Sequence, residues 1–402
     1  MKALIIVCDG MADRPLKELD MKTPLEFAKT PKMDEMARGG ICGILDPIAP
    51  GVRVGSDTSH LALLGYDAYK VYTGRGPFEA AGVGLEVLPG DIAFRCNFAT
   101  VDEDLKVKDR RAGRIREGTR ELAEAVNKIK AKDVKIFFKE STTYRAALVL
   151  RGRGLSYRVS DSDPHFVGAK VRWIEPLDDS PEAKRTSKVL NEFLREVHET
   201  LKMHEVNLKR IEDGKPPANM ILLRGAGVVP HLSSFEEVYH LKGACISTVG
   251  LLRGIGRMCG LDVIEVETDI RIKDICEKAL KALKNHEFLL LNIKDADNAA
   301  HDKNAQKKVA IIEEIDKCLS IFSDFMEDDY LVLLSDHTTT ISYGDHTGDP
   351  VPIVICGPEV RTDDVIEFNE RAVAKGGLNR IEGRDVMNIL MNLMYRSEKF
   401  GA

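Results

Sequence analysis

Acidic residues and histidines in this chain recur beside short apolar runs. Four carboxylates come directly beyond such a run: Asp9, Asp295, Asp297 and Asp336. Three histidines lie near the later carboxylates: His301, His337 and His346. The i, i+4 spacing of Asp297 and His301 would place both side chains on one helix face, about 5–6 Å apart. Carboxylate and imidazole at that separation can bind one cation.

Taken singly, none of these residues indicates a metal centre, because a strand-end Asp is more often a helix cap. Together, the carboxylates and histidines do predict one. Six of these residues exceed the needs of one tetrahedral ion: Asp9, Asp297, His301, Asp336, His337 and His346. Mixed oxygen and imidazole ligands suit transition metals better than calcium. We therefore expect two divalent ions, manganese first, with cobalt, zinc and magnesium as alternatives. Paired ions about 3.5–4 Å apart are a common arrangement for phosphoryl transfer.

Ser56 is a candidate nucleophile for such a transfer. It lies in Gly55-Ser-Asp-Thr-Ser-His60, just before the apolar stretch Leu61–Leu64, so we expect it at a helix N-terminus. Backbone N–H groups and the helix dipole favour a bound phosphate there. A serine hydroxyl needs a base or a metal to activate it, and the expected metal centre supplies one. The alternative, that Ser56 is only a helix cap, is equally compatible with this motif alone.

Short apolar runs alternate with longer stretches of helical periodicity, which predicts an α/β fold with a mostly parallel sheet flanked by helices. The expected strands of this core are Lys2–Val7, Ile41–Leu45, Asn219–Leu223, Ala244–Thr248, Val263–Val266, Glu287–Ile293, Tyr330–Leu334 and Pro352–Cys356. Because ligands bind at the carboxyl edge of parallel strands, the strand-end acids are expected to converge there. Thr23-Pro24 and Ser180-Pro181 mark helix starts, the second one for a long amphipathic surface or bridging helix, Glu182–His204.

The pattern of apolar and polar residues changes between about Leu88 and Trp173. The runs Asp91–Phe98, Val134–Phe138, Arg145–Leu150 and Leu155–Val159 read as strands, with one helix, Glu117–Ala131, among them. We interpret residues 91–173 as an inserted, smaller α+β domain. Residues 1–90 and 174–402 would then form the metal-binding core.

Composition restricts the partners. Hydrophobic residues at 44% and charged residues at 30% describe an ordinary globular chain. The net charge of −6 comes from interspersed acidic and basic residues, so we expect no nucleic-acid and no membrane partner. Eight single cysteines indicate free thiols rather than disulfides or a zinc ribbon. A cytoplasmic protein that acts on a small phosphorylated molecule is expected; the sequence leaves open whether it forms an oligomer.

The motifs, taken in order, resemble the alkaline phosphatase superfamily, and within it the archaeal type of 2,3-bisphosphoglycerate-independent phosphoglycerate mutase. The matching stretches are Ile6–Asp13, Pro50–Tyr66, Thr73–Ala80, Lys242–Cys245, Gly250–Gly256, Ile293–Asp297 with His301, Ser335–Thr339 and His346–Pro352. The resemblance extends over essentially the whole chain.

The resemblance implies one metal held by Asp9, Ser56, Asp336 and His337, and the other by Asp297, His301 and His346. It implies a phosphoserine at Ser56 and interconversion of 3-phosphoglycerate and 2-phosphoglycerate, in glycolysis and gluconeogenesis, without 2,3-bisphosphoglycerate. The bacterial branch carries Ser-Glu where this chain has Ser56-Asp57, which leaves the role of Asp57 open.

A phosphoserine must be protected from water, so the inserted domain is expected to act as a lid that also binds substrate. Arginines bind carboxylate and phosphate bidentately. The expected substrate-binding residues are Arg110, Arg114, Arg145, His165 and Arg253, with Asp109 as a proton shuttle.

Sister activities remain open, because one such metal core serves several reactions. The alternatives are a metal-dependent phosphatase and a homoserine kinase-like phosphotransferase, although the sequence contains no G-x-x-x-x-G-K-[ST] phosphate loop. An inactive, metal-stabilised binding protein is disfavoured, because Ser56 and all the expected ligands are present.

Overall fold

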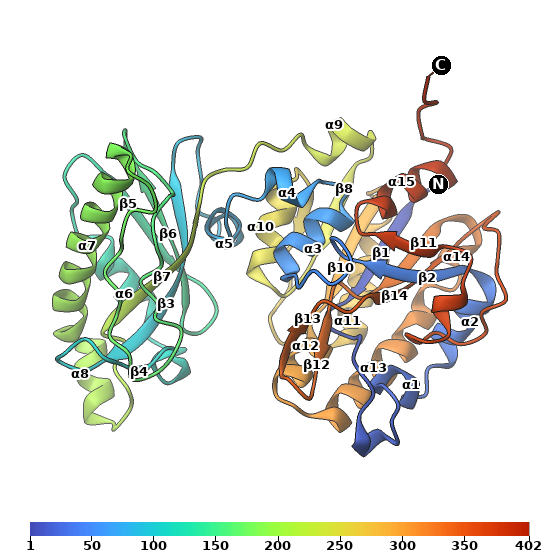
Figure 1. The fold of residues 1–402 in the computed structure, drawn as a ribbon, viewed down its shortest axis with the longest axis horizontal. Helices are drawn as coiled ribbons and strands as arrows, with labels where there is room; N and C mark the ends of the chain where they lie inside the picture. The colour runs from blue at the N-terminus through green and yellow to red at the C-terminus, as the bar shows by residue number, and fades with distance from the viewer. Residues whose placement is uncertain (402) are drawn as a thin grey trace. The chain divides into compact units, whose positions relative to one another are not determined.

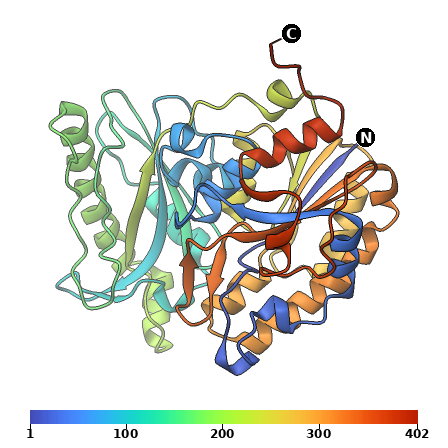
Figure 2. The same ribbon diagram turned by 45° about the vertical axis from the view of Figure 1, so that its right-hand side comes forward.

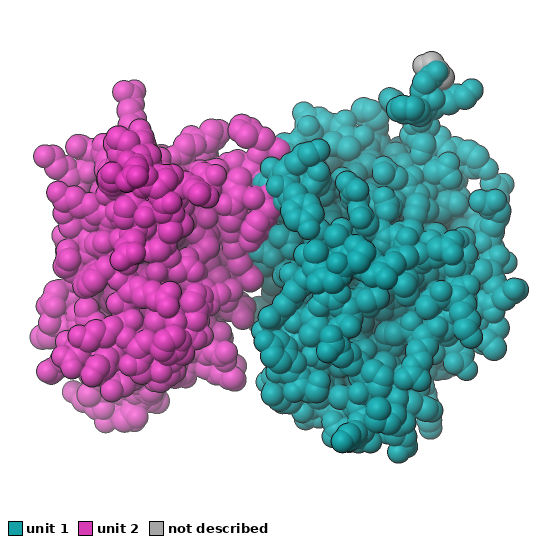
Figure 3. Space-filling view, in the orientation of Figure 1, with its two compact units in different colours: residues 1–71, 232–402 teal, residues 72–231 magenta. Residues whose placement is uncertain are grey.

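The computed structural model describes residues 1–401. The chain folds into two compact units. Unit 1 comprises residues 1–71 and 232–402, and unit 2 comprises residues 72–231 (Figures 1 and 3). Unit 1 is therefore discontinuous in sequence, whereas unit 2 is one continuous segment. No helix within residues 1–401 combines the length and the apolar character that crossing a membrane requires.

Unit 1 is built on an eight-stranded sheet. Its strands follow the order β15 (Asn379–Glu382), β2 (Ile41–Asp46), β14 (Val351–Cys356), β11 (Tyr330–Leu334), β1 (Ala3–Cys8), β10 (Phe288–Ile293), β8 (Gly243–Ile246) and β9 (Asp262–Ile264). Of these eight, only β14 runs antiparallel to its neighbours. The predicted α/β class with a mostly parallel sheet is confirmed.

Helices cover both faces of this sheet (Figure 2). Leu4 and Ile6 of β1 share a hydrophobic core with α2 (Pro31–Gly39), α11 (Ile272–Ala282) and α13 (Ala305–Leu319). On the opposite face, the Cys245 thiol contacts the Leu252 carbonyl of α10 (Gly250–Met258). Helix α3 (Ser56–Leu63) packs on α10 on that side, and α15 (Asp385–Leu393) packs on α3. Burial on both faces explains why the central strands read as unbroken apolar runs.

Strand register brings several loops to one edge of the sheet. Cys8 pairs with Ile293 and Val7 pairs with Leu334, so the chain leaves β1, β10 and β11 at one level. Because β14 runs the other way, it begins at this same edge. The hairpin of β12 (Thr338–Thr340) and β13 (Asp345–Thr347), which connects β11 to β14, therefore lies there too.

Unit 2 is an antiparallel sheet centred on β3 (Ile92–Val101). The partners of β3 are β6 (Arg145–Arg151), β7 (Met220–Gly227) and β4 (Val107–Asp109), and β5 (Lys135–Glu140) pairs with β6. Phe94, Cys96 and Phe98 face a core shared with α6 (Thr119–Val126) and α7 (Pro181–Lys202). Ala93 points the other way, against α5 (Gly76–Gly82). Alternation along β3 therefore puts Arg95 on the α5 face.

Short helices complete the chain. They are α1 (Pro24–Phe27), α4 (Ala68–Val71), α8 (Glu205–Glu212), α9 (Phe235–Tyr239), α12 (Asp295–His301) and α14 (Phe325–Asp328), with 3-10 turns at Lys17–Leu19, Ala112–Arg114, Ser320–Phe322 and Val373–Lys375. Thr23 and Ser180 cap α1 and α7 through their side chains, as their Thr-Pro and Ser-Pro pairs predict. Pro31 begins a new helix, so the stretch up to Gly39 forms two helices rather than one.

Unit 2 is larger than the insertion of residues 91–173 expected from the sequence, for three reasons. Helix α5 packs on β3 and β6. The run Asn219–Leu223, expected in the parallel sheet, instead forms β7 beside β3. The long helix α7, expected as a surface or bridging element, buries Leu190, Phe193 and Leu194 in the core of unit 2.

Other strand expectations also differ from the structure. The run Leu155–Val159 is not a strand and contributes only an isolated bridge between Val159 and Pro176. Strands β12, β13 and β15 were not predicted, because they are short and mostly polar, and three or four residues give too little alternation to detect.

Candidate active site

Asp9, Asp297, Asp336 and His337 gather at the carboxyl edge of the unit 1 sheet. Asp9 directly follows β1, and Asp336 and His337 lie just beyond β11. Asp297 lies in the first turn of α12, which follows β10. Each of these side chains is at most 1% exposed, so the strand-end acids lie in a buried cluster.

Gly10 allows the loops after β1 and β10 to approach each other closely. Its φ is +63°, and a Cβ atom there would lie 2.7 Å from the Asp297 Oδ1 atom and 2.7 Å from the Thr339 Oγ1 atom. Only glycine fits both that backbone conformation and that space. The Gly10 N–H also donates to Asp336 Oδ1 at 3.1 Å, which joins the β1 loop to the β11 loop.

The first group of polar atoms converges on Nε2 of His337. This nitrogen lies 3.2 Å from Ser56 Oγ, 3.3 Å from Asp336 Oδ2 and 3.6 Å from Asp9 Oδ1. Ser56 is the first residue of α3, as expected, and its side chain points into this cluster. The structure thus brings together the four residues for which the family resemblance implies one shared ion.

The second group surrounds Asp297. Nε2 of His301 lies 3.3 Å from one carboxylate oxygen, and Nε2 of His346 lies 3.5 Å from the other. Nδ1 of His301 donates to the Gly344 carbonyl at 2.9 Å, and Nδ1 of His346 donates to the Val54 carbonyl at 2.8 Å. Because a carbonyl oxygen only accepts, each ring is protonated at Nδ1, and Nε2 is the atom left to bind a metal.

Burial shapes the charges in this cluster. Burial, reinforced by Asp336, raises the pKa of Asp9. Burial likewise lowers the pKa of His337 well below its usual value, so the ring stays neutral. Burial acts to raise the pKa of Asp297, but the interactions with the His301 and His346 side chains outweigh it and hold that pKa below its ordinary value. Neutral imidazole and ionised carboxylate are the forms that bind metals.

These residues fit divalent ions. In two groups, Asp297 with His301 and His346, and Asp9 with Asp297 and His337, one potential ligand atom per residue lies within 4.8 Å of the others. Oδ2 of Asp336 is buried and has no hydrogen-bond partner among residues 1–401. A buried carboxylate oxygen left without a partner is strongly disfavoured, and a cation would satisfy it.

Lys294 is a residue of this cluster that sequence reasoning missed. Its ammonium lies 2.8 Å from Asp9 Oδ1 and 2.6 Å from Asp297 Oδ2. Burial acts to lower the pKa of Lys294, but Asp9 and Asp297 outweigh it and raise the pKa above its ordinary value. Lys294 directly follows β10, and a polar residue just after an apolar strand is the signal by which the acids were identified. Sequence reasoning considered only carboxylates at such positions.

Asn292 and His60 were missed as well. Asn292 donates to Asp9 Oδ2 at 3.0 Å, and its amide nitrogen lies 3.4 Å from Nε2 of His60. His60 in turn donates from Nδ1 to the Ser56 carbonyl at 2.7 Å. These two side chains thus connect the loop of Asp9 with helix α3. The available signal was a polar amide within the apolar strand β10.

Unit 2 carries a separate cluster of arginines on the α5 face of its sheet. Arg95 is directly opposite Arg224 in the register of β3 and β7, and Asn97 is opposite Arg145. The Nε atoms of Arg95 and Arg145 are buried and have no hydrogen-bond partner in the described part of the chain. Like charges that face each other across a sheet are destabilising. We define Arg95, Arg145 and Arg224 as the arginine face.

Two carboxylates partly neutralise the arginine face: Asp163, whose Oδ2 atom lies 3.4 Å from Nη1 of Arg224, and Glu79. Oε1 of Glu79 lies 2.7 Å from Nε of Arg75 and 3.7 Å from Nε of Arg95. Burial, together with the neighbouring Arg75, nevertheless lowers the pKa of Arg95 to about 9. An incoming anion would relieve both the repulsion and the unmet hydrogen bonding, so the arginine face suits a carboxylate or phosphate.

The substrate-binding residues that the sequence predicts in unit 2 differ in burial and in hydrogen-bond partners. Arg145 belongs to the arginine face, and Arg110 makes a bidentate pair with Asp163 at 3.0 and 2.6 Å. Arg114 and His165 are exposed. Arg224 was not predicted, because its place on this face depends on pairing between β3 and β7.

Asp109 and Arg253 also have identified neighbours. The Asp109 carboxylate accepts from the backbone N–H groups of Arg111 and Gly113, at 2.7 and 2.8 Å, which stabilises a turn. Arg253 lies on α10 in unit 1, where its Nη1 atom is 3.1 Å from Glu265. Asp109 thus stabilises a turn, and Arg253 pairs with an acidic side chain of its own unit.

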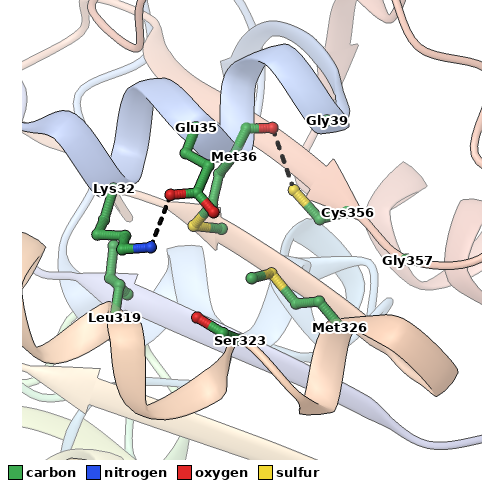
Figure 4. Close-up of a pocket in the computed structure, with 9 residues that line it drawn as sticks. All are labelled: Lys32, Glu35, Met36, Gly39, Leu319, Ser323, Met326, Cys356 and Gly357. Atoms are coloured by element: carbon green, nitrogen blue, oxygen red, sulfur yellow. Dashed lines mark hydrogen bonds and ion pairs between the residues drawn. The ribbon is translucent and has the colours of Figure 1, made fainter.

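A pocket of about 230 Å³ lies elsewhere in unit 1 (Figure 4). Its lining includes Met36, Met326 and Cys356, with the Lys32–Glu35 ion pair beside them. Because Cys356 pairs with Leu331 at the start of β11, this pocket lies at the sheet edge opposite the buried cluster. None of the expected site residues lines it.

Comparison with known proteins gives one consistent result. Residues 37–207 match the family model described as 2,3-bisphosphoglycerate-independent phosphoglycerate mutase. A protein of that name from Methanothermobacter thermautotrophicus is 57% identical, with all of both chains covered. Another from Methanocaldococcus jannaschii is 54% identical, with 100% of this chain and 99% of its own covered.

Two solved structures are similar along nearly the full length. A Pyrococcus horikoshii protein superposes with a TM-score of 0.87 at 37% identity, covering 100% of this chain and 99% of its own. A cofactor-independent phosphoglycerate mutase from Thermoplasma acidophilum gives 0.73 at 39% identity, covering 98% and 100%. With these relatives and the buried Ser56 cluster in view, the chain belongs to the 2,3-bisphosphoglycerate-independent phosphoglycerate mutase family.

Proposed function

We propose that this protein is an isomerase that interconverts 3-phosphoglycerate and 2-phosphoglycerate by intramolecular phosphoryl transfer, without 2,3-bisphosphoglycerate. The observation that carries the proposal is the convergence of Ser56, Asp9 and Asp336 on Nε2 of His337, in a chain whose relatives bear this name. A nucleophile among metal ligands is the arrangement that this reaction needs. The expected cytoplasmic location and the role in glycolysis and gluconeogenesis go with this proposal.

The metal assignment is part of the proposal. One manganese ion would be held by Asp9, Ser56, Asp336 and His337. The other would be held by Asp297, His301 and His346. When bound, the two ions would supply positive charge for the transferring phosphoryl group and favour the ionised form of the serine hydroxyl.

Ser56 then carries the chemistry. The Ser56 hydroxyl loses its proton as its oxygen forms a bond to phosphorus; the bond from phosphorus to the 3-oxygen breaks, and the 3-oxygen takes up a proton. Glycerate reorients, and its 2-hydroxyl loses its proton as the 2-oxygen accepts the phosphoryl group; the Ser56–phosphorus bond breaks, and the Ser56 oxygen regains a proton. The N–H groups at the start of α3 and the ammonium of Lys294 stabilise the negative oxygens of the phosphoryl group.

Unit 2 has the role of the substrate-binding lid. The arginine face binds the carboxylate of the glycerate group, which must stay bound between the two transfers. Exclusion of water keeps the phosphoserine from hydrolysis. We assign this binding to Arg95, Arg145 and Arg224, in preference to Arg114 and His165, which are exposed.

The experiment starts from protein stripped of metal by a chelator. Manganese or cobalt is added back with 3-phosphoglycerate, in the absence of 2,3-bisphosphoglycerate, and formation of 2-phosphoglycerate is measured. Metal-dependent formation supports the proposal. Release of inorganic phosphate as the main product, or transfer to homoserine, would replace it with one of the sister activities.

A further inference from the structure

Lys308 is a buried lysine for which the proposed reaction has no use. It is the fourth residue of α13 and is 0% exposed. Burial lowers the pKa of Lys308, although the charge of Asp13 opposes this effect. A cation near a helix N-terminus is also disfavoured by the helix dipole. Something at this position must therefore stabilise the ammonium.

Three oxygens surround the Lys308 ammonium. Its Nζ atom lies 2.8 Å from Asp13 Oδ2, 3.2 Å from the Ala12 carbonyl and 2.9 Å from the Thr339 carbonyl. An ammonium has three N–H donors, so this cage uses each of them. Ala12 and Asp13 belong to the loop after β1, whereas Thr339 belongs to β12. One side chain thus joins two segments that are distant in sequence.

Other hydrogen bonds join the same two segments. The Thr339 N–H donates to the Ala12 carbonyl at 3.2 Å, and Met11 N–H donates to Ser335 Oγ at 3.1 Å. The Ile341 N–H lies 3.3 Å from both carboxylate oxygens of Asp13. We define residues 9–13 and 335–341 as the paired loops. Lys308 is a side chain from outside the paired loops that bonds to both of them.

Thr339 extends this arrangement to the proposed metal ligands. Its hydroxyl donates to Asp297 Oδ1 at 2.7 Å and lies 3.0 Å from Nδ1 of His337. A hydroxyl has one proton to donate, so the His337 ring donates from Nδ1 and presents Nε2 toward Ser56. Thr339 therefore holds one proposed ligand of each ion. Any displacement of the Thr339 backbone would change the separation between them.

We propose that Lys308 is a positioning residue, which fixes the paired loops against each other and thereby sets the spacing of the two metal sites. This inference rests on the proposed function for the identity of the ligands. Within the described residues, the Lys308 ammonium bonds to Ala12, Asp13 and Thr339, none of which is a proposed metal ligand or the proposed nucleophile. It acts through Thr339 on Asp297 and His337.

The test compares Lys308→Met with Lys307→Met, a neighbour on the same helix whose side chain is 53% exposed. Methionine is close to lysine in length and removes the charge and the donors. Manganese binding is titrated on metal-free protein, and amide hydrogen exchange is followed by mass spectrometry. We expect manganese affinity to fall by about tenfold or more in Lys308→Met, as for loss of a residue that orients metal ligands, and to be unchanged in Lys307→Met.

The exchange measurement separates this inference from the proposed function. Faster exchange in residues 9–13 and 335–341 of metal-free Lys308→Met, with β7 unchanged, would support the positioning role whatever reaction the wild-type protein catalyses. Manganese affinity and loop exchange that both match the wild type would overturn it. Failure of the wild type to convert 3-phosphoglycerate would overturn the proposed function instead.

A second variant covers the case in which Lys308→Met does not fold. Asp13→Asn keeps the size of the side chain and one acceptor for Lys308, but removes the counter-charge. We expect weaker manganese binding than in wild type and faster exchange of the paired loops. Wild-type values for both measurements in folded Asp13→Asn would count against the inference.

Discussion

Nε2 of His337 lies 3.2 Å from the hydroxyl oxygen of Ser56, although 281 positions separate the two residues in sequence. The contact exists because β11 ends at the same sheet edge as β1 and α3 begins beside that edge with Ser56. It places the proposed nucleophile within the proposed ligand set of one ion. The first prediction tests that arrangement.

Ser56→Ala should abolish mutase activity and leave manganese binding only modestly weaker, because the other ligands of that ion remain. Intact-protein mass spectrometry after brief exposure to 3-phosphoglycerate should show a phosphate adduct on wild type alone. Ser59→Ala is the matched control, since Ser59 is buried on the same helix and its hydroxyl donates to the Ser56 carbonyl at 3.4 Å. Normal turnover in Ser56→Ala would reject the nucleophile.

His301→Ala should remove one ion rather than both. His301 contacts Asp297 and Gly344, and it takes no part in the group around His337. Manganese stoichiometry at low free metal should therefore fall from two toward one per chain, with mutase activity lost. The exposed His231 provides the control variant His231→Ala, for which the stoichiometry should stay at two. An unchanged stoichiometry in His301→Ala would show that the ligand assignment is incorrect.

Arg145→Gln should weaken substrate binding while stabilising the ligand-free protein. Removal of one cation from the arginine face relieves repulsion with Arg95, so the Tm without substrate should rise. Loss of a bidentate partner for the substrate carboxylate should raise KM by about tenfold or more. Arg114→Gln, at an exposed position, should change neither quantity. A lower Tm with an unaltered KM would instead indicate a purely structural arginine.

Glu370 gives a pH dependence of stability that is separate from catalysis. Burial raises the pKa of Glu370 from 4.5 to about 6, although Thr23 and the Asp13 N–H both donate to its carboxylate. Because the pKa of Glu370 is higher in the folded than in the unfolded state, its carboxyl group stabilises the fold fully at a pH below the unfolded-state pKa of 4.5. This stabilisation is lost as the pH rises through about 6. Between about pH 4.5 and pH 7.5, wild type should therefore lose up to roughly 2 kcal/mol relative to Glu370→Gln.

Urea denaturation of metal-free protein across that range measures this difference. Glu367→Gln, at a nearby exposed position, should follow the wild-type curve. A Glu370→Gln curve parallel to that of wild type throughout would show that the carboxylate titrates normally.

The features predicted from the sequence are those that depend on local pattern. Unbroken apolar runs identify central parallel strands, and polar residues just after such a run lie near the carboxyl edge, which is where the structure places Asp9, Asp297 and Asp336. β7 was misplaced because the apolar run Met220–Leu223 would suit either sheet. Only long-range pairing decides which sheet a run joins.

The arginine face and Lys308 are hidden from the sequence for related reasons. The opposition of Arg95 and Arg224 follows from the register between β3 and β7, which no local pattern reveals. Lys308 lies in an amphipathic helix, where a lysine normally indicates a solvated position. Its oxygen cage is assembled from two other segments of the chain.

The discontinuity of unit 1 has a consequence for biosynthesis. Unit 2 is complete once residue 231 has left the ribosome, and its sheet pairs only strands from within residues 92–227. At that moment unit 1 has β1 and β2 but still lacks the strands that flank them in the finished sheet. Domains generally fold as units during synthesis. We therefore expect unit 2 to become resistant to protease on the ribosome before unit 1 does. Asp9 and Ser56 can bind a metal only after the last quarter of the chain has been synthesised.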